Sequence, residues 1–134
     1  MEGSLLYVSR RLATPADIRD IVETSRVRNA RLQVTGALVA SRNRFAQILE
    51  GPRAALDALM DSIRRDRRHT EVEVVMHADI ERRRFPEWTL AYSGTSVFVD
   101  GLIEALAKRA DTRGHAGDVQ RLVQAIEGLS RARP

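Results

Sequence analysis

The sequence predicts an α+β fold in which helices cover a single sheet. Five segments alternate apolar and polar residues with the two-residue period of a strand, and two segments between them repeat apolar residues at helical spacing. Two further helical segments follow near the C-terminal end. The order strand, helix, strand, strand, helix, strand, strand is typical of a ferredoxin-like sandwich (βαββαββ), with a five-stranded mixed sheet and two helices on one face. The two C-terminal helices are additions to it.

The first strand is predicted at residues 5–10, and the first helix follows a short turn. Thr14 is a suitable N-cap, and Pro15 fits the first helical turn because its fixed backbone angle is helical and its missing N–H is not needed there. The helix is expected to end near residues 28 and 29. Asn29 would then follow the helix, where it could cap the last turn or hold a ligand.

The middle of the chain is predicted to form an antiparallel hairpin and a second helix. Residues 32–41 and 44–50 are the two strands, joined by a short polar link. Gly51 and Pro52 end the hairpin and open a helix with an apolar stripe. Strands at 71–77 and 88–92 complete the sheet. The stripe consists of Leu56, Leu59, Met60 and Ile63.

The predicted strands are apolar on both faces, so two helices cannot cover the whole sheet. The tail offers two amphipathic segments, separated by the helix-breaking stretch 111–118. We expect these helices to pack on the second face of the sheet or on a partner. The expected organisation is therefore a ligand-binding domain at 1–95 and a two-helix extension at 96–134. The apolar residues of the tail are Leu102, Ile103, Leu106, Val119, Leu122, Val123 and Ile126.

Composition narrows the possible functions. The 134 residues include no cysteine, which excludes disulfides, thiol catalysis and thiolate metal sites. No apolar run is long enough for a signal peptide or a membrane span, so we expect a soluble cytoplasmic protein without membrane contact. The three histidines are scattered, and no acid-base pair or ligand spacing predicts a metal site or a hydrolase.

The net charge of +4 comes almost entirely from arginine, since Lys108 is the only lysine. Arginine clusters lie at residues 64–68 and 82–84. They could be solvated loop charges, a nucleic-acid patch, or a grip on the phosphates of a nucleotide cofactor. Aromatic side chains that stack on bases are not interleaved with the arginines, so we expect no direct binding to nucleic acid.

One polar residue interrupts the apolar pattern of the third predicted strand. Phe45, Gln47 and Leu49 share a face of that strand, so an amide lies between two apolar side chains. A buried amide without partners costs about 1–3 kcal/mol, so something polar must meet it. Each candidate partner could also be an ordinary core or capping residue. The candidates are Tyr7, Asn29 and Trp88.

Five stretches of the chain resemble the successive motifs of BLUF domains, which are blue-light sensors that use FAD. The resemblance spans about residues 5–93 and extends loosely to the tail helices. It implies that a flavin ring lies between the two helices of the sandwich, edge-on to the strands. The stretches are LLYVSR at 5–10, SRVRNARLQVTGAL at 25–38, RFAQILEG at 44–51, DRRH at 66–69 and RRFPEWTL at 83–90.

The resemblance implies roles for individual residues. Tyr7 matches the electron donor to the excited flavin, and Gln47 matches the glutamine that bridges the tyrosine and the flavin edge. Trp88 matches a photoactive-site tryptophan whose in-or-out placement is disputed in relatives. The chain departs from the family pattern at Leu90, where methionine is common, and at Arg28, where histidine or asparagine is commoner. The implied cofactor-binding residues are Tyr7, Ile21, Ser25, Arg28, Asn29, Phe45, Gln47, Leu49, Ile63, Arg68 and His69.

The resemblance implies a short FAD-binding photoreceptor without enzymatic activity of its own. Light would rearrange the hydrogen bonds among Tyr7, Gln47 and the flavin. The output would reach a downstream protein or a homo-oligomer, as a dimer or larger. The alternative is a light-insensitive flavin-binding or adaptor protein of the same fold that acts through its C-terminal helices.

Overall fold

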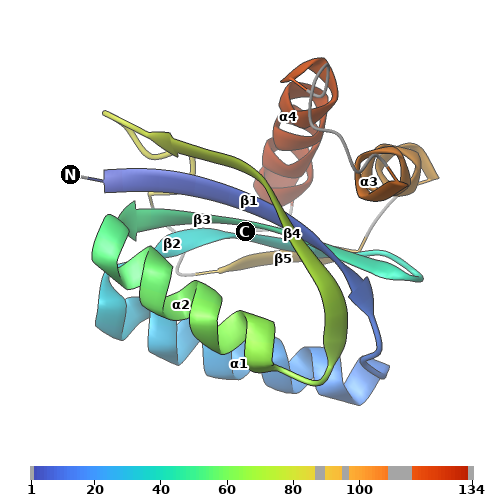
Figure 1. Cartoon of the computed structure of the whole chain (residues 1–134), viewed down its shortest axis with the longest axis horizontal. Coiled ribbons are helices and arrows are strands. Elements are labelled where there is room, and N and C mark those ends of the chain that lie inside the picture. Colours follow the sequence, from blue (N-terminus) through green and yellow to red (C-terminus); the bar gives the residue numbers. More distant parts are fainter. Residues whose placement is uncertain (1, 87–89, 95–96, 109–115, 133–134) are drawn as a thin grey trace.

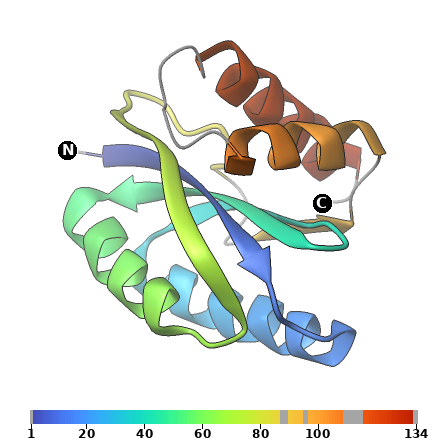
Figure 2. The same ribbon diagram turned by 45° about the vertical axis from the view of Figure 1, so that its right-hand side comes forward.

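A single sheet separates two pairs of helices, as Figures 1 and 2 show. The computed structural model describes residues 2–86, 90–94, 97–108 and 116–132. Within these ranges, no helix is both long enough and apolar enough to cross a membrane. The elements are β1 (Glu2–Arg11), α1 (Pro15–Leu32), β2 (Thr35–Ala40), β3 (Arg44–Pro52), α2 (Arg53–Arg65), β4 (His69–Asp79), β5 (Ala91–Gly94), α3 (Val97–Lys108) and α4 (Ala116–Ala132).

The predicted α+β class and element order are confirmed. The strands lie in the order β4-β1-β3-β2-β5. The first four pair antiparallel, whereas β5 is a short edge strand parallel to β2. The predicted bounds of this last strand, 88–92, were wrong: pairing begins with Ala37 opposite Ala91 and ends with Ala40 opposite Gly94. The length of β5 therefore follows from the part of β2 that it meets, and residues 88 and 89 lie outside the described residues.

The first helix begins as predicted but ends later than predicted. Thr14 and Asp17 form a reciprocal capping box, in which each side chain accepts from the other residue's backbone N–H. The helix continues to Leu32 because no helix breaker lies between Asn29 and Leu32. It ends where Gln33 adopts a left-handed conformation, with φ 59° and ψ 35°. The prediction that Asn29 follows the helix was wrong, since Asn29 is fully buried inside the last turns.

Helices α1 and α2 lie side by side on one face of the sheet (Figure 1). The four apolar residues predicted on the second helix are all buried. They pack in one cluster with Leu5, Tyr7 and Leu49, which come from β1 and β3. Side chains at every second position of these strands therefore point toward the two helices.

Helices α3 and α4 cover the opposite face of the sheet. Their buried residues join those of β1, β2 and β3 in a second cluster, so the described tail packs on the sheet of its own chain. An ion pair of 3.0 Å links Arg44 of the β2–β3 hairpin to Glu104 of α3, and another of 3.0 Å links Arg84 to Glu127 of α4. The division of the chain into domains at residue 95 stays a prediction. The cluster contains Leu6, Val8, Ala37, Val39, Ala46, Ile48, Phe85, Ile103, Leu106, Val119, Leu122, Val123 and Ile126.

Truncating the apolar face of α4 should destabilise the whole chain. Leu122 is fully buried in the second cluster, so Leu122→Ala should lower the free energy of unfolding by about 2–5 kcal/mol. Gln124→Ala, on the exposed side of the same helix, should change it by less than about 0.5 kcal/mol. Urea unfolding measures both. Equal effects of the two substitutions would show that α4 does not pack on the sheet.

Candidate functional site

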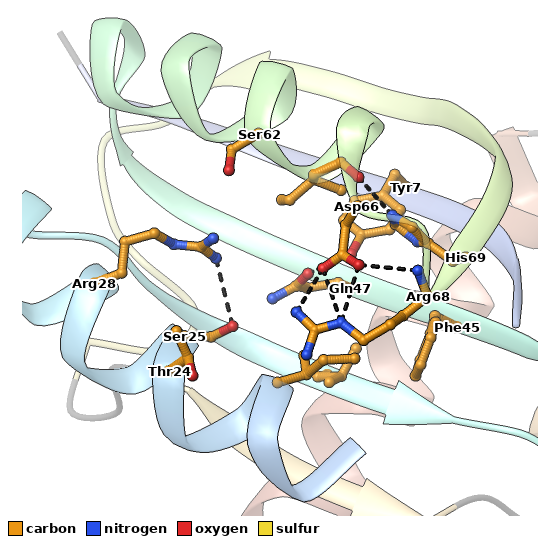
Figure 3. Close-up of a pocket in the computed structure, with 13 residues that line it drawn as sticks. Tyr7, Thr24, Ser25, Arg28, Phe45, Gln47, Ser62, Asp66, Arg68 and His69 are labelled. Carbon is orange, nitrogen blue, oxygen red and sulfur yellow. Dashed lines mark hydrogen bonds and ion pairs between the residues drawn. The ribbon is translucent and has the colours of Figure 1, made fainter. Parts of the chain in front are cut away.

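A pocket lies between α1 and α2, with the sheet as its floor (Figure 3). It encloses about 540 Å³ of space, a volume that includes the open solvent at its mouth. Both the helices and the sheet contribute polar as well as apolar side chains to its lining. The lining residues are Tyr7, Ile21, Thr24, Ser25, Arg28, Leu38, Phe45, Gln47, Ser62, Ile63, Asp66, Arg68 and His69.

Tyr7 and Gln47 form the polar centre of the pocket floor. They are directly opposite each other in the antiparallel pairing of β1 with β3, so both side chains point to the same face. The Tyr7 hydroxyl donates a hydrogen bond of 2.5 Å to Gln47 Oε1. Both residues are less than 5% exposed, at 3% for Tyr7 and 4% for Gln47. The tyrosine is thus the partner that the amide in the apolar pattern required, and the amide nitrogen is left for other contacts.

Burial keeps the Tyr7 phenol in its neutral form. Desolvation raises the pKa of Tyr7 far above its ordinary value of about 10, because a phenolate would lose its hydration. The positive charge of Arg28 opposes this rise in pKa, and the negative charge of Asp66 adds to it. Near neutral pH, Tyr7 therefore retains the proton that it donates to Gln47.

His69 fixes the pocket wall beside Tyr7. Its Nε2 lies 2.6 Å from the carbonyl oxygen of Ile63, which can only accept, so Nε2 carries a proton. In the neutral ring, Nδ1 then accepts from the Ser9 hydroxyl at 2.8 Å. The imidazole lies edge-on to Tyr7 and Phe45, with ring centroids 6.0 and 6.1 Å away. These contacts hold the Tyr7 ring in place.

Arg68 links both helices at the pocket mouth. Its guanidinium contacts both carboxylate oxygens of Asp66, with the shortest distance 2.7 Å, and donates to Asp20 of α1 at 3.0 Å. The hydrogen bond from Arg68 lowers the pKa of Asp66, which therefore stays ionised. Figure 3 shows Asp66 and Arg68 pointing toward each other. The mouth of the pocket is thus polar and charged.

Arg28 brings a positive charge to the side of the pocket formed by α1. Its Nη2 lies 3.4 Å from the Ser25 hydroxyl, and its buried Nε has no hydrogen-bond partner among the described residues. Partial burial lowers the pKa of Arg28, because the cation loses hydration. A guanidinium with an unused donor favours a ligand that offers an oxygen or nitrogen acceptor at this point.

Most of the residues predicted for the site surround the pocket, but two do not. Asn29 is buried in the last turns of α1, and Leu49 is buried in the cluster under α2, so neither lines the pocket. Trp88 lies outside the described residues. Whether the lining residues bind a cofactor stays a prediction. Those around the pocket are Tyr7, Ile21, Ser25, Arg28, Phe45, Gln47, Ile63, Arg68 and His69.

Four lining residues were not among the predicted site residues. Leu38 lies opposite Gln47 in the β2–β3 hairpin, so the hairpin register could have identified it. Thr24 follows Ile21 by three positions on the same helix, which places them on neighbouring parts of one face. Asp66 begins the DRRH stretch at 66–69, so that motif could have identified it, whereas nothing in the sequence pattern distinguishes Ser62 from other polar residues of the chain.

The fold and the pocket define a class of small α+β domains with a pocket between two helices and a sheet. The family model described as "Sensors of blue-light using FAD" matches residues 3–91. The chain therefore belongs to the BLUF family.

Several relatives are photoactivated adenylate cyclases. The chain is 42% identical over 90 residues to subunit beta of the Euglena longa enzyme. This match covers 65% of this chain and 10% of that protein. The chain is 40% identical over 90 residues to subunit beta from Euglena gracilis, with the same coverage. The chain thus spans about a tenth of the length of the curated relatives that it matches.

Solved structures share the fold, and one of them is a BLUF protein. The protein in the dark-state structure of BlrB, a BLUF protein, is 40% identical in sequence to this chain, and the two structures superpose with a TM-score of 0.77. The match covers 95% of this chain and 96% of the BlrB chain. A bacterial light-regulated adenylyl cyclase is 26% identical with a TM-score of 0.70, and the match covers 92% of this chain but 36% of that protein. The similarity to the cyclase is therefore restricted to one part of it.

The buried phenol should make the stability of the chain sensitive to high pH. The pKa of Tyr7 is higher in the folded than in the unfolded chain. The contribution of this phenol to the free energy of unfolding is therefore complete below about pH 10, and it is lost as the pH rises toward the pKa of the folded state. The free energy of unfolding should fall by up to about 1.4 kcal/mol per pH unit above pH 10 from this group.

Tyr7→Phe should reduce this slope, because it removes the titrating group. Urea unfolding at about pH 8 and about pH 11 gives the comparison. Identical pH dependence in the two proteins would contradict a buried, neutral phenol at position 7.

Proposed function

We propose that this chain is a blue-light photoreceptor that binds FAD in the pocket between α1 and α2 and signals through Tyr7 and Gln47. The single observation that carries this proposal is the buried hydrogen bond from the Tyr7 hydroxyl to Gln47 Oε1 on the pocket floor. The name of the family, sensors of blue light using FAD, supports FAD as the cofactor. One similar structure, BlrP1 from Klebsiella pneumoniae, is described with FMN, so the shared chemistry is that of a flavin.

The residues around the pocket fit a flavin ring. A planar aromatic ring needs apolar groups against its faces and hydrogen-bonding groups at its edge. Ile21 of α1 and Ile63 of α2 supply apolar walls from the two helices. The Gln47 amide and the unpartnered Arg28 Nε supply donors for the ring's carbonyl and nitrogen edge. These residues would hold the cofactor.

A bound flavin would supply the absorption of blue light and an excited state that takes up an electron. Tyr7 would donate this electron. Its hydrogen bond to Gln47 would provide a route for the proton that an oxidised phenol must release. The proton passes from the Tyr7 hydroxyl to Gln47 Oε1, the atom that already accepts it in the hydrogen bond. Return of the same electron, and of the same proton from Gln47 Oε1, to Tyr7 would leave no net oxidation.

The lasting change would lie in Gln47. Rotation of its amide, or a shift to its imidic tautomer, exchanges the donor and acceptor that it presents to the pocket. Because Gln47 is buried at 4% exposure, a new arrangement must be accommodated by neighbouring side chains rather than by solvent. The altered hydrogen bond would move the flavin absorption to longer wavelength.

The output would pass to another protein or to further copies of this chain. Several relatives are named as photoactivated adenylate cyclases, which suggests that this type of domain can control an effector. We propose that this chain acts as a sensor and not as an enzyme, and that its β5 and tail helices carry the signal. A cytoplasmic location and a homo-oligomer remain predictions.

Removing either partner of the central hydrogen bond should abolish the light response. Tyr7→Phe and Gln47→Leu should both keep bound flavin, because the apolar walls remain, but neither should show the light-induced red shift. Illuminated-minus-dark absorption spectra measure this. Tyr92→Phe, which alters the second of the two tyrosines, is the matched control and should respond normally. A normal reversible shift in Tyr7→Phe would rule out Tyr7 as the electron donor.

A further inference from the structure

Arg26 joins the helix that lines the pocket to the residue that precedes β5. It lies on α1 beside Ser25, which lines the pocket, but Arg26 itself is not among the lining residues. Its Nε donates a hydrogen bond of 3.0 Å to the backbone carbonyl oxygen of Leu90, 64 positions later in the sequence. Because the donor is a guanidinium, this hydrogen bond is charge-assisted and stronger than one between neutral groups.

Leu90 in turn touches the wall of the pocket. Its side chain is 2% exposed and belongs to the same buried cluster as Leu38 and Phe45, which both line the pocket. Leu38 is also the direct neighbour of Gln47 in the β2–β3 pairing. A change in the volume or hydrogen bonding around Gln47 can therefore reach Leu90 through the side chains of this buried cluster, because close packing transmits such changes.

The strand that follows Leu90 is weakly held. β5 has four residues and pairs with β2 alone, from Ala91 to Gly94, at the edge of the sheet. A short edge strand with pairing on one side opens at a low free energy, so an additional hydrogen bond at its start should measurably slow that opening.

We propose that Arg26 is a positioning residue that holds the start of β5 against the pocket wall, and that without this hold less of the light-driven change proposed above reaches β5. The transmission part rests on the proposed function; the holding part does not. Arg26 itself contacts neither Tyr7 nor Gln47, so its loss should leave the pocket chemistry intact.

Amide hydrogen exchange of the full chain in the dark tests the holding part. Arg26→Ala should accelerate exchange of the Ala91–Gly94 amides roughly tenfold, because the charge-assisted bond to Leu90 is lost. The matched control is Arg19→Ala. Arg19 is exposed on the same stripe of α1, two turns earlier, and makes no hydrogen bond or ion pair within the part of the chain that the structure describes.

Unchanged exchange of the β5 amides in Arg26→Ala would overturn the proposal. The proposal would also be overturned if Arg19→Ala accelerated exchange of the Ala91–Gly94 amides equally, or if Arg26→Ala accelerated exchange of the α2 amides equally. Either result would show a general loss of stability and not a local effect on β5.

The same measurement under blue light, on protein loaded with FAD, tests transmission. The unsubstituted chain should show a light-minus-dark difference in exchange at Ala91–Gly94, and Arg26→Ala should lose at least half of it while its red shift keeps full amplitude. A merely structural role for Arg26 would not lower the exchange difference while leaving the red shift unchanged.

Two results would overturn the proposal that Arg26 is needed for transmission to β5. One is a full light-minus-dark difference in exchange in Arg26→Ala, and the other is no such difference in the unsubstituted chain when its red shift is normal. A missing red shift in the unsubstituted chain would instead overturn the proposed function, and the dark experiment would still decide whether Arg26 holds β5.

Discussion

The hydrogen bond between Tyr7 and Gln47 depends on a strand register that the whole sheet enforces. A slip of one residue between β1 and β3 would move one partner to the opposite face, toward α3 and α4. Gly36 helps to fix the register on the other side of β3. A Cβ at this position would lie 2.0 Å from the carbonyl oxygen of Ile48, so only glycine allows β2 to approach this closely. The pocket chemistry is therefore a consequence of backbone pairing.

The two faces of the sheet have different roles. The face under α1 and α2 carries the polar pocket, whereas the face under α3 and α4 is almost entirely apolar. Besides Ser4, Glu50 is a buried polar exception on that second face. It is fully buried, and its Oε1 accepts from the backbone N–H groups of Arg84 and Phe85, at 2.6 and 3.1 Å. The strand that carries Gln47 thus also anchors a segment that precedes β5.

The sequence predicted those features that depend on periodic patterns. Alternation in β1 and β3 identified Tyr7 and Gln47, and helical spacing identified the buried stripe of α2. The end of α1 could not be predicted, because a left-handed Gln33 closes it instead of the usual glycine. The hydrogen bond from Arg26 to Leu90 joins residues that are distant in the chain, and it involves a backbone carbonyl, which no side-chain pattern reveals. Whether the tail helices cover the sheet or a partner also required the packed structure.

An illuminated-minus-dark absorption spectrum of the unsubstituted chain loaded with FAD tests the central claim most directly. A buried phenol bonded to a buried amide beside the ring should give a flavin band that moves reversibly to longer wavelength and retains its shape, because only hydrogen bonding changes. Return to the starting spectrum in the dark completes the expected result. A spectrum that stays unchanged in light, or one that bleaches through lasting flavin reduction, would contradict a switch made of Tyr7 and Gln47.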